Sequence, residues 1–133
     1  MPSSPSERQT VPVFLKPSIW STRYGPNFFT LSVTGFIIQN NTFAEYSIEV
    51  KRGTEVWVVN HRFREFVDLW EHLYGLGPRL PSLPPKTFLC FRDLSPDYLL
   101  ARQRALEECL HDLLQIPGAG EIESVTEFLE LLH

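Results

Sequence analysis

The sequence predicts an α+β fold: a three-stranded antiparallel β-meander packed on a small helical subdomain. Apolar residues alternate with polar ones over 29–59, as in half-buried strands. From residue 62 onward they recur at steps of three and four, as in amphipathic helices. A proline-rich loop separates the first helix from the later ones. With 133 residues, 43% of them apolar, the chain is long enough for one domain with one core.

Three segments have the alternation of strands, and they start at Phe28, Phe43 and Thr54. The first is expected to bulge at Gly35 and to bury one face, made of Phe29, Leu31, Val33 and Ile37. Asn40-Asn41 and Arg52-Gly53 are turn signals. Because both connections are this short, neighbouring strands must be antiparallel and form a meander.

An amphipathic helix is predicted from Arg62 to about Gly75. Its apolar stripe is Phe63, Phe66, Val67, Trp70, Leu73 and Tyr74. Arg62 and Arg64 flank Phe63 at the helix start, where unpaired N–H groups and the helix dipole favour anions. Two guanidiniums with an aromatic ring between them suit a phosphate carried on a ring. The alternative is a first turn with solvated arginines beside a core phenylalanine.

The stretch from Pro78 to Lys86 holds four prolines, so it is expected to be extended and largely polyproline II. An apolar run, 87–91, then falls inside a loop. Ser95 and Pro96 are typical of the first positions of a helix, and Pro117-Gly118 is expected to stop it. Its predicted buried stripe is Leu99, Leu106, Cys109, Leu110, Leu113 and Leu114, with Arg102 on the same face.

A last helix is predicted from about Glu121, with a stripe of Ile122, Val125, Leu129 and Leu132. Residues 1–25 are rich in proline and serine and are interpreted as an extended or mobile lead-in, which leaves 26–133 as the domain. The lead-in and an ending directly after the last helix favour a fragment of a longer protein.

The composition narrows the function. The net charge of −4 disfavours general attraction to nucleic acid or anionic lipid, so any polyanion must bind at a local basic pocket. No apolar run is long enough to span a membrane, and the N-terminus lacks the apolar run of a signal peptide. Cys90 and Cys109 match no metal motif and are expected to be reduced and structural, as in a cytosolic protein.

The order of these parts resembles the phox-homology (PX) domain, the phosphoinositide-binding module of sorting nexins and their relatives. The resemblance rests on three strands, a helix that opens Arg-Phe-x-Glu-Phe, a Pro-x-x-Pro-Pro-Lys loop, and a helix with Arg-x-x-x-Leu. No single piece is diagnostic, but the ordered set is specific, and it covers roughly residues 26–133.

The resemblance implies a phosphoinositide site. It assigns the 3-phosphate to Arg62, the face of the inositol ring to Phe63, the 1-phosphate to Lys86, and the 4- and 5-hydroxyls to Arg102. Arg64 is expected to assist at the 3-phosphate. The chain departs from the family pattern in two places, with His61 for a frequent basic residue and Arg102-Gln103-Arg104 for paired arginines. These departures put a second site for other anionic lipids in doubt.

The apolar loop suggests how headgroup binding becomes membrane binding. We expect Phe88, Leu89 and Phe91, which follow Lys86, to form a membrane-insertion loop that enters the interfacial region. The alternative is that the two phenylalanines fold back onto the core. The sequence therefore predicts a module that binds phosphatidylinositol 3-phosphate and recruits its parent protein to the cytosolic face of endosomal membranes, as a peripheral protein in the cytoplasm.

Other functions remain as alternatives. The stretch Pro81–Lys86 fits Pro-x-x-Pro-x-Lys, a form read by SH3 domains, and a PX domain can also serve mainly to recruit trafficking proteins. Catalysis is disfavoured, because the histidines match no nucleophile or metal arrangement, and His72 and His111 are expected on solvated helix faces. No catalytic residue, metal, cofactor or nucleic-acid partner is expected.

Overall fold

The structure, a computed structural model, describes residues 29–85 and 94–131. Its strands are β1 (Thr30–Gln39), β2 (Phe43–Arg52) and β3 (Glu55–Arg62). Its α-helices are α3 (Phe63–His72), α4 (Pro96–Leu114) and α5 (Glu123–Phe128), and its 3-10 helices are η3 (Tyr74–Arg79) and η4 (Ala119–Glu121). The predicted lead-in, 1–25, and its boundary with the domain lie outside the described residues.

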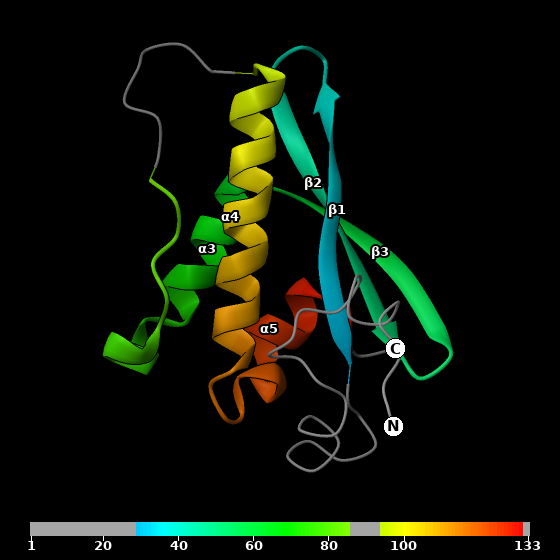
Figure 1. The fold of residues 1–133 in the computed structure, drawn as a ribbon. Coiled ribbons are helices and arrows are strands. Elements are labelled where there is room, and N and C mark those ends of the chain that lie inside the picture. The colour runs from blue at the N-terminus through cyan, green and yellow to red at the C-terminus, as the bar shows by residue number, and fades with distance from the viewer. Residues whose placement is uncertain (1–28, 86–93, 132–133) are drawn as a thin grey trace, which may run out of the picture.

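The strands form one antiparallel sheet in the order β1-β2-β3, and the helices pack on one side of it (Figure 1). This confirms the predicted α+β fold and meander. Both turns need residues with positive φ: Asn40 and Asn41 have φ of 52° and 53°, and Gly53 has φ of 62°. Glycine and asparagine tolerate this region better than other residues, which explains the turn signals.

The expected bulge lies between Val33 and Gly35, where the register of β1 on β2 shifts. It changes which side chains face the core beyond that point. Phe36 packs against Tyr46, with ring centroids 6.4 Å apart, while Ile37 points away and is 49% exposed. The prediction that Ile37 shares the buried face was therefore wrong, because one extra residue in a strand reverses the alternation.

The helix α3 ends earlier than the periodicity predicts. It stops at His72, with Leu73 as its C-cap, and the chain continues as η3. Tyr74 is consequently off the helix and 84% exposed, so its placement in the buried stripe was wrong. The buried side of α3 instead includes Leu69, which the predicted stripe left out.

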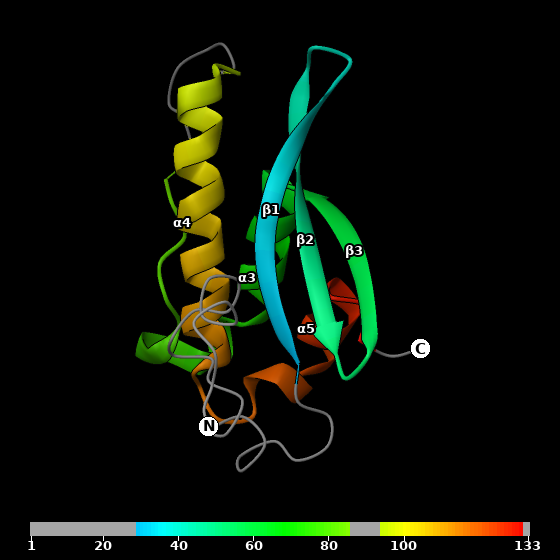
Figure 2. The same ribbon diagram turned by 45° about the vertical axis from the view of Figure 1, so that its right-hand side comes forward.

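A row of polar side chains on α4 binds the outer edge of β1. Gln103 Nε2 donates to the Val33 carbonyl at 3.0 Å, and the Val33 N–H donates to Glu107 Oε1 at 2.7 Å. His111 Nε2 lies 2.9 Å from the Leu31 carbonyl, to which it donates. These residues are four apart and so share one helix face, which runs along β1 in Figure 2. His111 is only 2% exposed, so its predicted solvated position was wrong.

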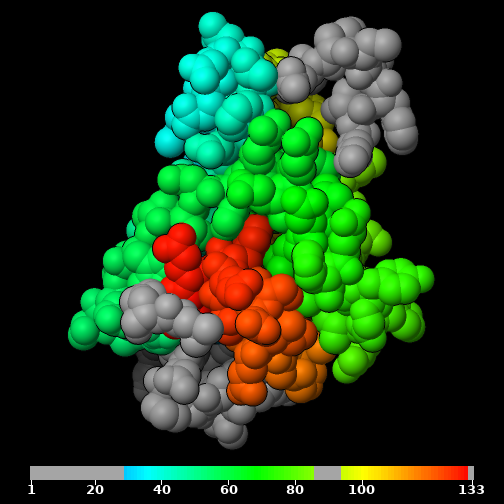
Figure 3. Space-filling model, turned by 180° about the vertical axis from the view of Figure 1, so that it is seen from behind, coloured from blue at the N-terminus to red at the C-terminus, as the bar shows by residue number. Residues whose placement is uncertain are grey.

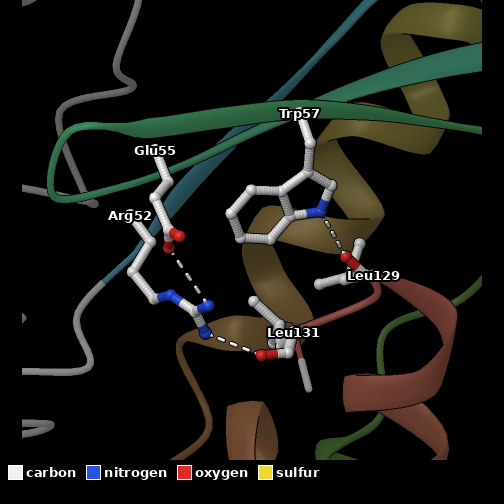
Figure 4. A network of polar contacts seen from close by, with 5 residues as sticks. All are labelled: Arg52, Glu55, Trp57, Leu129 and Leu131. Atoms are coloured by element: carbon white, nitrogen blue, oxygen red, sulfur yellow. Dashed lines mark hydrogen bonds and ion pairs between the residues drawn. The ribbon is translucent and has the colours of Figure 1, made fainter. Parts of the chain in front are cut away.

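The end of α5 is held by side chains of the β2–β3 hairpin. Trp57 Nε1 donates to the Leu129 carbonyl at 2.9 Å, and Arg52 donates to the Leu131 carbonyl at 2.7 Å (Figure 4). Leu129 is the C-cap residue of α5, whose carbonyl has no partner within the helix, and Leu131 lies just beyond it, so these donors hold the end of the helix and the residues that follow. Figure 3 shows α5, in red, lying between β3 and α3. The residues that follow α5 are thereby attached to the sheet near the β2–β3 turn.

Burial of His111 makes the stability of the fold depend on pH. Desolvation lowers the pKa of His111 below its ordinary 6.5. Below pH 6.5, His111 therefore binds a proton in the unfolded chain at pH values where it stays neutral in the folded chain. We expect the free energy of unfolding to fall as pH drops below 6.5, by at most about 1.4 kcal/mol per pH unit from this group.

Urea unfolding of wild type and His111→Gln at pH 7.5 and 5.5 measures this contribution. Glutamine keeps a donor for the Leu31 carbonyl but does not titrate, so the variant should lose less stability on acidification. The exposed His72, changed to glutamine, serves as the matched control and should behave as wild type. An equal loss in wild type and His111→Gln would contradict the prediction.

Candidate functional site

The junction between β3 and α3 places Arg62 and Phe63. The strand continues through Arg62, which is the N-cap of α3 with an extended backbone (φ −84°, ψ 164°), so the helix begins at Phe63. The Arg62 N–H donates to Glu65 Oε1 at 2.8 Å. A carboxylate at the third helical position that accepts from the N-cap is half of a capping box. The backbone from which the Arg62 side chain extends is thereby fixed at the end of the sheet.

The guanidinium of Arg62 stacks on an aromatic ring from the neighbouring strand β2. Its central carbon lies 4.0 Å from the ring centroid of Phe43, the first residue of β2. Arg62 is paired with Glu45 across the sheet, and Phe43 is two residues from Glu45, so all three are on one face. A guanidinium stacked on a ring keeps its N–H edge available for hydrogen bonds to an anion.

Phe63 and Arg102 are brought into contact. The guanidinium carbon of Arg102 lies 3.9 Å from the ring centroid of Phe63 and 5.0 Å from that of Tyr98, one turn earlier on α4. Arg102 also donates to the Pro85 carbonyl at 2.8 Å. One side chain therefore joins α4, the start of α3 and the end of the proline-rich stretch, the three segments in which residues are predicted to bind the lipid headgroup.

The cations of this region are not neutralised by carboxylates. Over residues 29–85 and 94–131, the ion pairs involve Lys51, Arg52 and His61, and none involves Arg62, Arg64 or Arg102. Tyr46, close enough to feel the charge of Arg102, has its pKa raised to about 12 by burial, which that charge only partly offsets. Its hydroxyl therefore stays neutral. The site therefore holds three guanidiniums without an ion-pair partner among the described residues, although the protein as a whole is acidic.

Of the remaining predicted site residues, the structure describes only Arg64. Arg64 lies at the second position of α3 and is exposed. Lys86 and the loop residues Phe88, Leu89 and Phe91 lie outside the described residues, as does Cys90. The described residues nevertheless reach Pro85, directly before Lys86, and Arg102 donates a hydrogen bond to the Pro85 carbonyl.

The proline-rich stretch is fastened along the helices by its carbonyl groups. Trp70 Nε1 donates to the Pro81 carbonyl at 2.7 Å, and the Cys109 thiol donates to the Ser82 carbonyl at 3.1 Å. Burial raises the pKa of Cys109 to about 11, which keeps it a thiol at neutral pH and fits the predicted structural role. With the bond to Pro85, three carbonyls of this stretch are held by the fold.

His61 links the site to the C-terminal residues. Its Nε2 lies 2.7 Å from the Phe128 carbonyl, and its ring stacks on Phe128 with centroids 3.9 Å apart. On the other side, Nδ1 lies 3.4 Å from Glu65 Oε1, the oxygen that also accepts from Arg62. The sequence placed His61 at the strand–helix junction, but its partner on α5 is 67 residues away and has no local signal.

Sequence reasoning also missed the rings that support the arginines. Phe43 was read only as a strand residue, and Tyr98 was not singled out. The Phe43–Arg62 contact joins neighbouring strands, so no local spacing predicts it, whereas Tyr98 and Arg102 are four residues apart on α4, a spacing that could have predicted their contact. In the part of the chain that the structure describes, no cluster of metal-ligating side chains occurs, and no helix is long and apolar enough to cross a membrane.

Comparisons with known proteins agree with this architecture. A family model described as "PX domain" matches residues 49–132. The fold is similar to an X-ray structure of a designed CISK-PX domain, with TM-score 0.68 and 28% identity over 74% of this chain and 96% of that chain. It is similar to the mouse SNX19 PX domain, solved with and without a bound sulphate ion, with TM-score 0.57 and 26% identity over 77% of this chain and 96% of that chain. A search of curated proteins gives no significant match.

The bond from the Arg62 N–H to Glu65 should contribute to stability. Replacing Glu65 with alanine removes the acceptor and should lower the free energy of unfolding by about 1 kcal/mol. Glu65→Gln keeps an acceptor oxygen and should lose less. Glu71→Ala, an exposed change on the same helix, is the matched control and should stay within about 0.5 kcal/mol of wild type. Chemical denaturation measures all three, and equal effects of Glu65→Ala and Glu71→Ala would refute the capping role.

Proposed function

The chain belongs to the PX-domain family, and on that premise we propose that it binds phosphatidylinositol 3-phosphate and recruits its parent protein to endosomal membranes. PX domains are generally phosphoinositide-binding modules that target proteins to membranes. The choice of lipid and of membrane is our proposal. This proposal is more specific than the family's general role, and it rests on residues at the β3–α3 junction, in the proline-rich stretch and on α4.

The observation that carries the proposal is the position of Arg102. Its guanidinium touches the Phe63 ring and binds the Pro85 carbonyl, and it pairs with no carboxylate among the described residues. Arg102, Phe63 and the residue before Lys86 therefore lie close together, which supports one shared site. A random distribution of arginines over an acidic surface would not do this. The arrangement supports a headgroup site bounded by the start of α3, the first turns of α4 and the residue that follows Pro85.

Each side chain has a chemical role in the proposed site. Arg62, stacked on Phe43 and without a carboxylate partner in the described residues, supplies planar two-pronged hydrogen bonding to the 3-phosphate. Arg64 adds charge at the start of α3, where unpaired N–H groups already favour an anion. The half-buried Phe63 offers an apolar face to the inositol ring, and Arg102, whose guanidinium lies against Phe63, is assigned to the 4- and 5-hydroxyls.

Lys86 completes the proposed site at the 1-phosphate. It directly follows Pro85, whose carbonyl is bound by Arg102, and a flexible ammonium needs only approximate placement to reach a phosphate. The mouse SNX19 PX domain was solved with a bound sulphate ion, which supports an anion site in a similar domain. Phe88, Leu89 and Phe91 follow Lys86, and we propose that they enter the membrane interface beside the bound headgroup.

Protein recruitment is the competing proposal. The SH3 form of it is disfavoured by the fold, because the carbonyls of Pro81, Ser82 and Pro85 are all hydrogen-bonded to the domain and the two SH3-type prolines are half-buried. The lipid-binding test below distinguishes phosphoinositide binding from the other form of this proposal, in which a trafficking protein docks elsewhere on the surface. We infer a binding role without catalysis, at the cytosolic face of endosomes and without nucleic acid.

The decisive experiment measures vesicle binding to each phosphoinositide in turn, together with titration of a soluble short-chain phosphatidylinositol 3-phosphate. Wild type should prefer the 3-phosphate lipid. Arg62→Ala should weaken soluble-lipid binding at least tenfold, because a charge-assisted hydrogen bond is worth about 1.5–3 kcal/mol. Arg104→Ala removes the same charge from an exposed position on α4 and is the matched control. Folded wild type that binds no phosphoinositide would move the function to protein recruitment.

The proposed insertion of the 88–91 loop has its own test. Leu89→Glu should weaken binding to vesicles that contain phosphatidylinositol 3-phosphate, since a charged side chain resists entry into the interface. Its affinity for the soluble short-chain lipid should not change, because Leu89 is not assigned to the headgroup. Vesicle affinity equal to that of wild type would rule out insertion by this residue.

A further inference from the structure

Three contacts restrain the side chain of Arg102. Its guanidinium carbon lies 3.9 Å from the ring centroid of Phe63 and 5.0 Å from that of Tyr98. Its Nη2 donates to the Pro85 carbonyl at 2.8 Å. An unrestrained arginine side chain samples many rotamers, and each of these contacts removes some of them. The guanidinium is therefore held in place before any ligand binds.

The contact with Tyr98 lies within α4. Tyr98 is four residues before Arg102, so the two side chains share one face of the helix. The Tyr98 ring is half-buried and packs against the core, which limits its own movement. Burial raises the pKa of Tyr46 to about 12, Arg102 opposes this rise and Tyr98 adds to it, so the three side chains lie near one another. The guanidinium thus has a firm aromatic support on its own helix.

The Pro85 carbonyl gives this part of the proposed site a chemical preference. A carbonyl oxygen has two lone pairs, so after it accepts from Arg102 it can accept from a second donor. A ligand group beside this pair meets N–H donors and a carbonyl acceptor together. A hydroxyl can accept from the first and donate to the second, whereas an ionised phosphate has no proton to donate. Beside the carbonyl, a hydroxyl is therefore the better partner.

This preference depends on where the guanidinium stays. Its charge alone favours a phosphate, because a charge-assisted hydrogen bond is stronger than one to a neutral hydroxyl. An arginine that could leave the carbonyl would follow an additional phosphate on the ring. An arginine held at the carbonyl presents the donor and acceptor pair that suits a hydroxyl. The restraint on Arg102 therefore decides which group is bound there.

We propose that Tyr98 is a positioning residue that keeps Arg102 beside the Pro85 carbonyl, and that the site consequently selects a ring with hydroxyls, rather than further phosphates, next to Arg102. This rests on the proposed function and deepens it, because it names the feature that separates a 3-monophosphate from a bisphosphate. The aromatic ring carries the effect, since its face attracts the guanidinium. Phe63 also supports Arg102, but it is itself assigned to the inositol ring, so Tyr98 is the residue whose change isolates the restraint.

The test measures affinity for soluble short-chain phosphatidylinositol 3-phosphate and for the matching 3,5-bisphosphate lipid, and compares their ratio among variants. Tyr98→Leu removes the ring but keeps an apolar side chain, and Tyr98→Phe keeps the ring. Tyr74→Leu is the matched control, because Tyr74 is 84% exposed on η3, outside the proposed site. Arg102→Lys keeps the charge on a flexible stem without the planar group, so it releases the same restraint by a second route. Thermal unfolding verifies that each variant is folded.

We expect wild type to bind the monophosphate lipid more tightly than the bisphosphate lipid, by about tenfold or more. Tyr98→Leu and Arg102→Lys should each lower this ratio by about fivefold to tenfold, in line with the loss of a cation–π contact. Tyr98→Phe and Tyr74→Leu should keep the wild-type ratio. A merely structural role of Tyr98 would weaken both affinities together and leave their ratio unchanged.

A wild-type ratio in Tyr98→Leu would overturn the positioning role, and if that variant does not fold, a wild-type ratio in Arg102→Lys has the same meaning. An equal fall in Tyr98→Phe would also overturn it, because the effect would then belong to the hydroxyl. Wild type that binds both lipids equally would overturn the selection while phosphoinositide binding stands. Wild type that binds neither lipid would overturn the proposed function, and this inference with it.

Discussion

The hydrogen bonds between α4 and the outer edge of β1 fix how the helices sit on the sheet. Gln103, Glu107 and His111 bind the backbone of two β1 residues, in place of a further strand. An exposed strand edge is prone to pairing with other chains, and a helix that covers it removes that hazard. Because Arg102 precedes Gln103 on a rigid helix, the same bonds determine where its guanidinium meets Phe63.

A second constraint is the proline-rich stretch, which crosses from η3 to the start of the loop before α4. Proline limits its backbone to an extended form, and its carbonyls accept hydrogen bonds from Trp70, Cys109 and Arg102. An extended segment that is anchored at three points has little freedom at its end. The position of Pro85, the last described residue before Lys86, is therefore set by the core and by α4 together.

The two ends of the sheet have different chemistry. Toward the β2–β3 turn, Trp57 and Arg52 donate to the carbonyls of Leu129 and Leu131, at the C-cap of α5 and just beyond it, which is a structural use of polar groups. Toward the β1–β2 turn, Arg62 and Arg102 stack on rings and keep guanidinium edges without a carboxylate in the described residues. An acidic protein can thus present a local cationic site, because its charges are segregated by position rather than balanced everywhere.

The sequence by itself determined the strands, the turns at Asn40-Asn41 and Gly53, the buried stripe of α4 and the order of segments that marks the family. These follow from backbone preferences and side-chain periodicity, which act over a few residues. Only the tertiary structure decided that Ile37 is exposed, that His111 is buried against β1, that Phe43 supports Arg62, and that Arg102 meets Phe63. Those outcomes depend on a bulge and on contacts between distant segments, and the free energy of such contacts exists only once the chain is packed.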